Sequence, residues 1–341
     1  MFPTDWAKFI GDCTSTIMIK LQRKLYYMTL KQLFIIDPWD KLHIQNDTTV
    51  HIMNQGILQS HTIHTCTEYD LYVSNKGCFA SVQHHTSPIN ESIRQTPSNQ
   101  TIENLETYDY IHIRKDPPFD DSYISLLWLL KDLQHPYIIN NPISLLIHNE
   151  KLATLLFPEY AIDSLVTSNI DTIEKFLCKF KKVVLKPLTL CSGRGIELLD
   201  IAMDWKQIAL QSTNNQTKKV LLQRYLPQIQ DGETRVFMVD ETPLAVMKKI
   251  PKAGSFKANF DFGASGIPYE LTPHEQKLCK TIGTYCKQHK LHFTALDIIG
   301  GYISEINMTS PGLLMETTRI YNYNYAQDII QYLEENREKN K

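Results

Sequence analysis

The chain has 341 residues, of which 43% are hydrophobic and 21% charged, as in an ordinary globular protein. This length exceeds what a single hydrophobic core supports, so we expect two or three domains. The formal net charge of −2 provides no strong overall field, which argues against nucleic acid or a membrane surface as a partner.

Cysteine spacing and hydropathy further restrict the kinds of protein that this chain can be. The seven cysteines are an odd number without close pairs, and none forms a C-x-x-C spacing. This pattern argues against a disulfide framework and a zinc site, and it indicates a reducing compartment, for which we predict the cytoplasm. No apolar run in the sequence approaches the roughly 20 residues that a membrane span requires.

The first 27 residues mix basic with scattered apolar side chains and lack the apolar core and cleavage site of a secretion signal. They could form a short amphipathic helix that packs on the body, or an extension that the folded unit does not need. We favour the dispensable extension, with the folded unit opening at Met28, because a clear strand pattern starts soon afterwards.

Residues 28–140 alternate between strand-like and helix-like patterns, which is typical of a parallel α/β domain. Strands are expected at 33–37, 61–67, 110–113 and 137–139, with a hairpin in 70–83 turning at 75–77. Helices are expected at 47–59, capped by Asp47 or Thr48, and at 120–134. The polar, turn-rich residues 86–104 predict a surface loop.

A second unit is expected from Asn141 onward, and its first helix spans 149–157. Lys151 lies in the first turn, where a cation opposes the helix dipole. We therefore interpret Lys151 as the partner of a bound anion, with a solvated lysine as the alternative. A short strand at 166–167 and a helix at 172–180 follow.

The next strand, 182–187, is apolar and closes on Lys186 and a proline. A charged residue at the end of a buried strand can direct an ammonium group at phosphate. The loop that follows, TLCSGRG at 189–195, contains Gly193 and Gly195, whose backbone amides could approach a phosphate. An ordinary hairpin turn is the alternative for this loop.

Further along, a short strand at 220–222 precedes a hairpin at 235–250 that turns at 240–242. The loop 252–266 is rich in glycine and alanine and contains Lys257 and Asn259. A loop of this length is typical of a lid or a binding loop. Helices are expected at 272–290 and, at the C-terminal end, at 324–335.

Residues 291–312 predict two short strands joined at Gly300 and Gly301. Asp297, Glu305 and Asn307 carry oxygen donors that suit a hard divalent cation, Mg²⁺ above all. A two-residue turn would place Asp297 opposite Ser304, whereas a three-residue turn with a bulge places it opposite Glu305. The metal interpretation therefore requires the three-residue turn, and acids that face water are the alternative.

In this order the motifs resemble the ATP-grasp superfamily, and most closely bacterial glutathione synthetase. The matching stretches are IRKDPPFD (113–120), NEKL (149–152), VLKPL (184–188), YLPQIQDGETRV (225–236), LDIIGGYISEIN (296–307) and TSP (309–311). The resemblance implies an α/β fold, α+β overall, with a Rossmann-like N-terminal pre-ATP-grasp domain at 28–140. A two-lobed ATP-grasp domain would follow, its small lobe at 141–222 and its large, metal-binding lobe at 223–341.

The resemblance also implies roles for single residues. The ATP site would comprise Lys151, Lys186, Gly193 and Gly195 at the phosphates, Gln223, Tyr225 and Leu226 at adenine, and Glu233 at ribose. Mg²⁺, or Mn²⁺ in its place, would bind Asp297, Glu305 and Asn307. Arg235 would act at the reacting phosphate, and the substrate site and lid would contain Arg114, Lys249, Lys257 and Asn259.

The implied reaction joins γ-glutamylcysteine to glycine at the expense of ATP, through an acyl phosphate, to give glutathione. No covalent enzyme nucleophile is needed, and a homo-oligomer is expected. Two alternatives remain open: an ATP-grasp ligase for another peptide or amino acid, and a nucleotide-binding protein that no longer ligates.

Three departures keep these alternatives open. The segment that the resemblance places at the ATP phosphates reads KPLTLCSG, at 186–193, where the family pattern is close to KPLDGMGG. Met315 replaces an arginine before Glu316, and Lys249 and Lys257 stand where the family has arginine. Leucine in a glycine's left-handed conformation would cost roughly 1–2 kcal/mol, so the loop either follows another path or grips phosphate less well.

Overall fold

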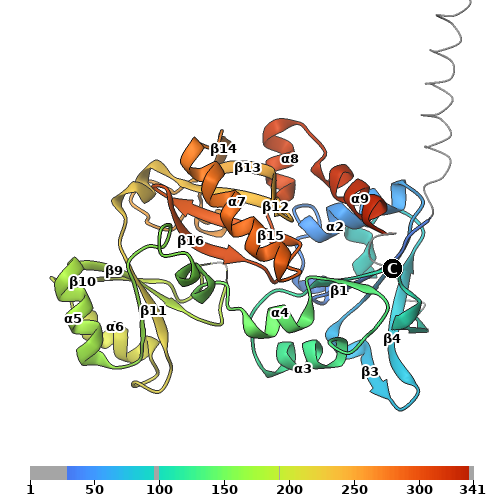
Figure 1. Ribbon diagram of the computed structural model, residues 1–341, viewed down its shortest axis with the longest axis horizontal. Helices are drawn as coiled ribbons and strands as arrows, with labels where there is room; N and C mark the ends of the chain where they lie inside the picture. Colours follow the sequence, from blue (N-terminus) through green and yellow to red (C-terminus); the bar gives the residue numbers. More distant parts are fainter. Residues whose placement is uncertain (1–28, 96–99, 192, 338–341) are drawn as a thin grey trace, which may run out of the picture.

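The computed structural model describes residues 29–95, 100–191 and 193–337. The predicted extension, 1–27, lies outside the described residues. Three β-sheets lie in a row along the longest axis of the molecule (Figure 1). The first third of the chain forms the sheet at one end, a four-stranded sheet lies at the other end, and a five-stranded sheet lies between them.

The N-terminal sheet has the order β3-β4-β2-β1-β6-β7, with β5 paired to β4. Its parallel strands are β1 (Lys31–Ile36), β2 (Thr62–Cys66), β6 (Tyr110–Arg114) and β7 (Tyr137–Ile139). Its antiparallel strands are β3 (Leu71–Ser74), β4 (Gly77–His85) and β5 (Gln100–Asn104). The predicted parallel arrangement holds for one half of the sheet only, and the predicted loop 86–104 contains β5.

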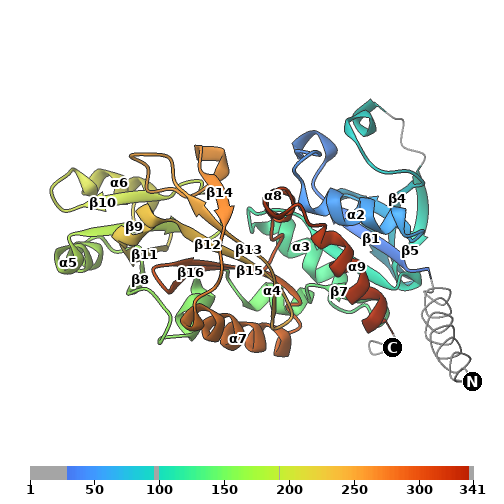
Figure 2. The same ribbon diagram turned by 90° about the horizontal axis from the view of Figure 1, so that it is seen from above.

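Helices cover both faces of this sheet (Figure 2). On one face, α2 (Thr48–Leu58) packs with α9 (Tyr325–Asn336) and α8 (Leu314–Tyr321), which come from the other end of the chain. Asp47 caps α2 by accepting hydrogen bonds from the amides of Thr49 and Val50, as predicted. On the opposite face lie α3 (Asp121–Leu130) and α4 (Pro142–Ile147).

The four-stranded sheet is antiparallel throughout, in the order β10-β9-β11-β8. Its strands are β8 (Ser164–Thr167), β9 (Lys182–Pro187), β10 (Glu197–Asp200) and β11 (Val220–Arg224). Helices α5 (Ile170–Phe180) and α6 (Trp205–Ser212) supply its separate hydrophobic core. Ile170, Ile173 and Leu177 are buried at helical spacing on α5, so one stripe of that helix faces the sheet.

The central sheet has the order β14-β13-β12-β15-β16. Its strands are β12 (Glu233–Val239), β13 (Thr242–Ile250), β14 (Ser265–Pro268), β15 (Phe293–Ile299) and β16 (Tyr302–Asn307). The long helix α7 (Pro273–Gln288) covers one face and starts at a capping box between Thr272 and Glu275. Because this sheet shares both of its cores with the N-terminal sheet, the two are joined by continuous apolar packing.

The predicted helix at 149–157 is wrong. The chain forms α4 first and then a 3₁₀ helix, η5 (Leu152–Leu156). The Asn149 side-chain oxygen caps this turn by accepting from the amides of Lys151 and Leu152. The Phe157 amide then donates to the Thr154 carbonyl, three residues back, as in a 3₁₀ helix. Lys151 thus precedes a short 3₁₀ helix, and the dipole argument made for it does not apply.

In the described part of the chain, no helix combines the length and apolarity that crossing a bilayer would require. No disulfide joins any of the described cysteines either.

Candidate active site

A cavity opens between the four-stranded sheet and the central sheet. Most of the residues singled out from the sequence line it: Lys186, Gly193, Gln223, Tyr225, Leu226, Glu233, Arg235, Lys249, Lys257, Asn259, Asp297, Glu305 and Asn307. Three predicted site residues are not among its walls. Lys151 is covered by its neighbours, Gly195 packs on Pro187, and Arg114 lines an adjoining cavity.

The hairpin β15–β16 forms one wall, and its turn differs from the predicted one. The turn has two residues, Gly300 and Gly301, so that Ile299 faces Tyr302. A β-bulge then shifts the register, and Asp297 pairs with Glu305 as the metal interpretation requires. The predicted pairing is confirmed, but the predicted three-residue turn is wrong.

The bulge residue is Ser304, which the sequence analysis did not select. Its hydroxyl accepts a hydrogen bond from the Lys186 ammonium at 3.0 Å, across the gap between the two sheets. Ile303 and Ile306 are both buried although they are three residues apart, which a regular strand with its period of two does not allow. That spacing was the available sequence signal for the bulge.

Asp297 is the electrostatic centre of the site. Arg235 donates to both of its carboxylate oxygens at 2.8 Å, and Lys249 donates to Oδ1 at 2.9 Å. Burial alone would raise the pKa of Asp297, but these two cations outweigh burial and hold the pKa below its ordinary value. The Asn307 amide nitrogen donates to the same carboxylate at 3.1 Å, which places Asn307 beside Asp297 as predicted.

Glu233, at the start of β12, belongs to the same ion-pair network. Its carboxylate lies 2.5 Å from the Lys249 ammonium, so Lys249 bridges Glu233 and Asp297. Burial and the negative charge of Asp297 raise the pKa of Glu233. The buried charges of Glu233, Lys249, Asp297 and Arg235 compensate one another, so a bound cation or polyphosphate would change these ion pairs.

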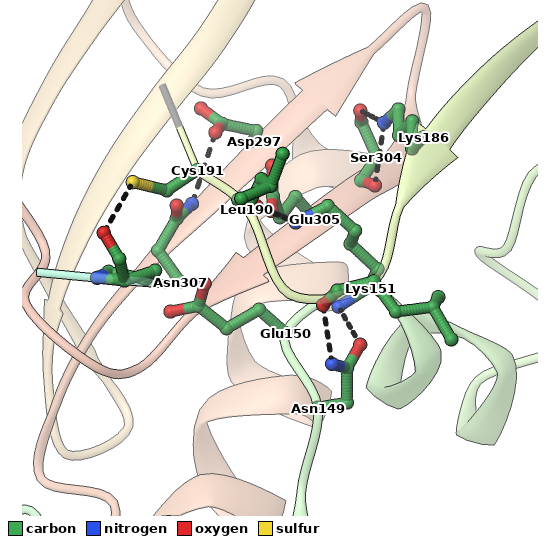
Figure 3. Close-up of polar contacts among 12 residues, drawn as sticks. Asn149, Glu150, Lys151, Lys186, Leu190, Cys191, Asp297, Ser304, Glu305 and Asn307 are labelled. Atoms are coloured by element: carbon green, nitrogen blue, oxygen red, sulfur yellow. Dashed lines mark hydrogen bonds and ion pairs between the residues drawn. The ribbon is translucent and has the colours of Figure 1, made fainter. Parts of the chain in front are cut away.

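Lys151 lies between Glu305 and the loop 189–195 (Figure 3). Its ammonium is 2.9 Å from the Glu305 carboxylate and donates to the Leu190 carbonyl at 2.6 Å. Burial would lower the pKa of Lys151, but the charges of Glu305 and Glu150 raise it overall. The anionic partner that we inferred for Lys151 is, in this structure, a carboxylate of the protein.

The loop 189–195 joins the antiparallel strands β9 and β10. It is therefore a hairpin connection, which was the alternative interpretation of this loop. Neighbouring segments hold its carbonyls: Asn149 donates to Leu188 at 2.8 Å, and the Phe119 amide donates to Thr189 at 3.0 Å. Gly193 and Gly195 have φ values of 72° and 67°, whereas Leu190 stays outside the left-handed region. The loop avoids leucine strain by following a path that does not need a glycine at 190.

The other end of the cavity contains a buried amide. Gln223 is 2% exposed, and its Nε2 has no hydrogen-bond partner among the described residues. An unsatisfied buried donor is costly, so this group needs an acceptor from outside the chain. Leu226 is buried beside it, which gives this end the apolar wall and single polar contact that a flat heterocycle prefers.

The hairpin has the donor set of a hard divalent cation. Asp297, Glu305 and Asn307 offer two carboxylates and an amide, and the two hydrogen bonds of the Asn307 amide nitrogen do not involve its oxygen. The described residues contain no cluster of three His, Cys, Asp or Glu side chains suited to a metal. A cation held here would therefore need further oxygens, which the phosphates of a bound nucleotide supply.

The fold is similar to that of ATP-dependent ligases of known structure. D-cycloserine synthetase DcsG superimposes with a TM-score of 0.63 at 13% identity, covering 89% of this chain and 99% of that chain. The ATP-grasp ligase PsnB superimposes with a TM-score of 0.58 at 13% identity, covering 89% and 98%.

The family follows from the sequence comparisons. Residues 30–145 match the family model for the N-terminal domain of prokaryotic glutathione synthetase, and residues 150–322 match that for its ATP-grasp domain. The glutathione synthetase of Coxiella burnetii is 31% identical over 311 residues, covering 90% of this chain and 97% of that protein. That of Nitrosomonas europaea is 30% identical over 315 residues, covering 90% and 98%.

The chain therefore belongs to the prokaryotic glutathione synthetase family and is an ATP-dependent carboxylate–amine ligase. Use of ATP and dependence on a divalent metal are general properties of this family.

Proposed function

We propose that the enzyme joins γ-glutamylcysteine to glycine, with ATP and Mg²⁺, to form glutathione, ADP and phosphate. Mn²⁺ is expected to substitute for Mg²⁺ at oxygen donors of this kind. The observation that carries the proposal is the convergence of Lys186, Arg235 and Lys249 with the oxygen donors of the hairpin on one cavity. The names of the relatives point to the same reaction.

The chemistry explains why these charges are needed. A carboxylate is a poor electrophile, so one of its oxygens attacks the γ-phosphorus of ATP, and ADP leaves with the electrons of the broken P–O bond. The amine then attacks the resulting acyl phosphate, and inorganic phosphate leaves as the amide bond forms. In this scheme Lys151 and Lys186 hold phosphate oxygens, and Arg235 and Lys249 stabilise the charge that develops on them.

The bound metal ion would neutralise phosphate charge at Asp297, Glu305 and Asn307. Because an acyl phosphate hydrolyses readily, the protein must also exclude water during the reaction. Lys257 and Asn259 lie in the loop that would close the cavity, and Lys257 already reaches the Gly193 carbonyl at 3.5 Å. We assign this loop the role of a lid.

The remaining sequence predictions stay part of the proposal. The partners are the three small substrates and a second copy of the chain, and neither nucleic acid nor a membrane is expected. The location is the cytoplasm, which cysteines without disulfides favour. We also keep 28–140, 141–222 and 223–341 as the proposed domain limits.

A second candidate is ligation of a different acid and amine by the same chemistry. Leu190 and Met315 favour it, because both differ from the family pattern. Each adjoins a residue, Cys191 or Glu316, that lines the adjoining cavity.

Phosphate release by the purified protein with ATP and Mg²⁺ tests the proposal. Release that requires both γ-glutamylcysteine and glycine is the expected result. Release with another acid–amine pair, and none with these two, would contradict it and support the second candidate.

A further inference from the structure

The strand β16, which carries two of the three proposed metal ligands, lies at the edge of the central sheet. Among the described strands, only β15 pairs with it along a ladder. Two carbonyls from the chain that follows α4 contact its other edge. The Tyr160 carbonyl accepts from the Ile303 amide at 2.8 Å, and the Glu150 carbonyl accepts from the Ile306 amide at 3.0 Å. The second contact lies directly before the proposed ligand Asn307.

Glu150 also holds the chain directly after Asn307, through its side chain. The Oε1 atom of Glu150 accepts three hydrogen bonds, from the Met308 amide at 2.8 Å and from the Thr309 amide and hydroxyl at 2.9 Å. Hydrogen bonds to an ionised acceptor are roughly twice as strong as bonds between neutral groups. With its carbonyl bound to Ile306 as well, Glu150 fixes the backbone on both sides of Asn307 (Figure 3).

The Glu150 carboxylate is placed there at a cost. The residue is 8% exposed, and burial together with the charge of Glu305 raises its pKa. The charge of Lys151 and the two backbone amides oppose that shift, but Lys151 forms its ion pair with Glu305. The hydrogen bonds of this buried charge therefore go to the segment that follows Asn307, and its stabilising effect is concentrated on that segment.

The backbone position of Asn307 determines where its side-chain oxygen points. The amide nitrogen of that side chain donates to the Ala295 carbonyl and to the Asp297 carboxylate, both at 3.1 Å. These two bonds orient the amide group, and its oxygen stays available beside the carboxylates of Asp297 and Glu305. A shift of the backbone at residues 306–309 would break this orientation.

We propose that Glu150 is a positioning residue for the metal site and acts through Asn307. Its carbonyl and carboxylate hold the backbone at residues 306–309, so that the Asn307 oxygen remains in place to bind a divalent cation. Loss of groups that orient a metal ligand typically weakens metal binding by roughly 10- to 100-fold. The inference rests on the proposed function, because Asn307 is a metal ligand only under that proposal.

Equilibrium binding of Mn²⁺ tests the inference. Mn²⁺ would be titrated into the full chain saturated with a non-hydrolysable ATP analogue, and free Mn²⁺ would be measured by electron paramagnetic resonance. Glu150→Gln retains the size and an acceptor oxygen but removes the charge. We expect the Kd for Mn²⁺ to rise roughly tenfold, while the affinity for the analogue without metal changes by less than about twofold. An unchanged Kd for Mn²⁺, or equal losses for Mn²⁺ and the analogue, would overturn the inference.

A double-mutant cycle shows whether Glu150 acts through Asn307. Asn307→Ala alone should raise the Kd for Mn²⁺ by roughly 10- to 100-fold, and adding Glu150→Gln should change it by less than about twofold. Additive effects would contradict the inference, because Glu150 would then act on the cation by its charge or through Lys151. Glu174→Gln, an exposed carboxylate on α5, is the control and should leave the Kd unchanged.

Thr309 provides a milder test, which applies if Glu150→Gln does not fold. Thr309→Val removes one of the three donors to Glu150 and should raise the Kd for Mn²⁺ by about threefold. Thr309→Ser keeps the hydroxyl and should bind Mn²⁺ like the wild type. Equal, wild-type affinity of the valine and serine variants would count against the inference.

These measurements separate the inference from the proposed function, because they use neither γ-glutamylcysteine nor glycine. Wild-type Mn²⁺ affinity in Asn307→Ala would refute the proposed metal ligands, and the inference with them. Weakened binding in Asn307→Ala, combined with unchanged binding in Glu150→Gln, would refute the inference alone. The phosphate-release assay tests the ligation reaction independently of both.

Discussion

The β15–β16 hairpin and the loop 189–195 both contact Lys151, yet they are held in place in different ways. In the hairpin, β15 is paired on both sides, with β12 and β16, and most of its residues are buried. The loop 189–195 is held by single hydrogen bonds to backbone carbonyls. Lys151 donates to Leu190, the Phe119 amide donates to Thr189, and Asn149 donates to the preceding Leu188. The hairpin is thus positioned by a sheet, whereas the loop is positioned by contacts that a nucleotide can replace.

This difference shows where the chain tolerates departures from its family. The proposed metal ligands Asp297, Glu305 and Asn307 match the family pattern. In the loop, Thr189, Leu190 and Ser192 replace an acid and two glycines. A change in the hairpin alters the ladder and the buried charges together. A substitution in the loop changes a side chain, whereas the hydrogen bonds that hold the loop are made to backbone carbonyls and can persist.

The largest effect is expected from Glu305→Gln in the hairpin. The change removes the carboxylate charge that faces Lys151 at 2.9 Å and one of three proposed metal ligands. Because a bound cation contributes several kcal/mol to charge stabilisation, we expect kcat to fall by about a hundredfold to ten-thousandfold. Steady-state phosphate release at saturating ATP and Mg²⁺ measures it.

Glu174→Gln, on the exposed face of α5, is the matched control and should retain full activity. Circular dichroism should show both variants folded. A Glu305→Gln enzyme with a near-normal kcat would eliminate the metal assignment of this hairpin.

The second effect concerns the loop, where Gly195→Ala should lower the free energy of unfolding by about 1–3 kcal/mol. Gly195 has a φ of 67°, and a Cβ there would lie 2.8 Å from Pro187 Cγ, so backbone strain and a clash act together. Gly254→Ala is the comparison, because its φ is 80° but a Cβ there meets nothing within 4 Å. Urea denaturation measures both, and equal losses in the two variants would show that Pro187 moves aside at no cost.

Sequence reasoning succeeded where the signal is local. The start of the helix expected at 272–290 is confirmed, and the structure explains it by a capping box between Thr272 and Glu275, which are only three positions apart in the chain. The pairing of Asp297 with Glu305 was also predicted from one hairpin, although it arises from a two-residue turn and a bulge in place of the expected three-residue turn.

Reasoning from the sequence failed where the determinants are weak or distant. The strand β5 is polar and mostly exposed, so it lacks the alternation that identifies a strand. The bulge at Ser304 was missed because the count placed the extra residue in the turn and left the strands beyond it regular. Arg114 and Glu316 line one cavity although about 200 positions separate them in the chain, and the packing of α8 against the N-terminal sheet brings them together.

A smaller effect is expected from Ser304→Ala, which retains the bulge but removes the hydroxyl that contacts Lys186. The Ser304 carbonyl, 3.3 Å from the same ammonium, remains as an acceptor. We therefore expect a loss of about 1 kcal/mol, seen as a roughly fivefold higher KM for ATP with kcat nearly unchanged. Ser304→Thr keeps the hydroxyl and should behave more like the wild type. A fall in kcat alone would instead place Ser304 at the chemical step.

The smallest effect is expected from Leu190→Gly, which restores a glycine to the loop. The contact with Lys151 is made by the Leu190 carbonyl, and residue 190 does not adopt a left-handed φ, so a glycine relieves no strain there. Nucleotide affinity, measured by calorimetry with a non-hydrolysable ATP analogue, should change by less than about threefold. Leu190→Ala removes most of the side chain but keeps the restricted backbone, and it should match the glycine variant. An affinity that rises tenfold with glycine and not with alanine would show that nucleotide binding requires a left-handed residue at 190, and that the loop must leave its present path to grip phosphate.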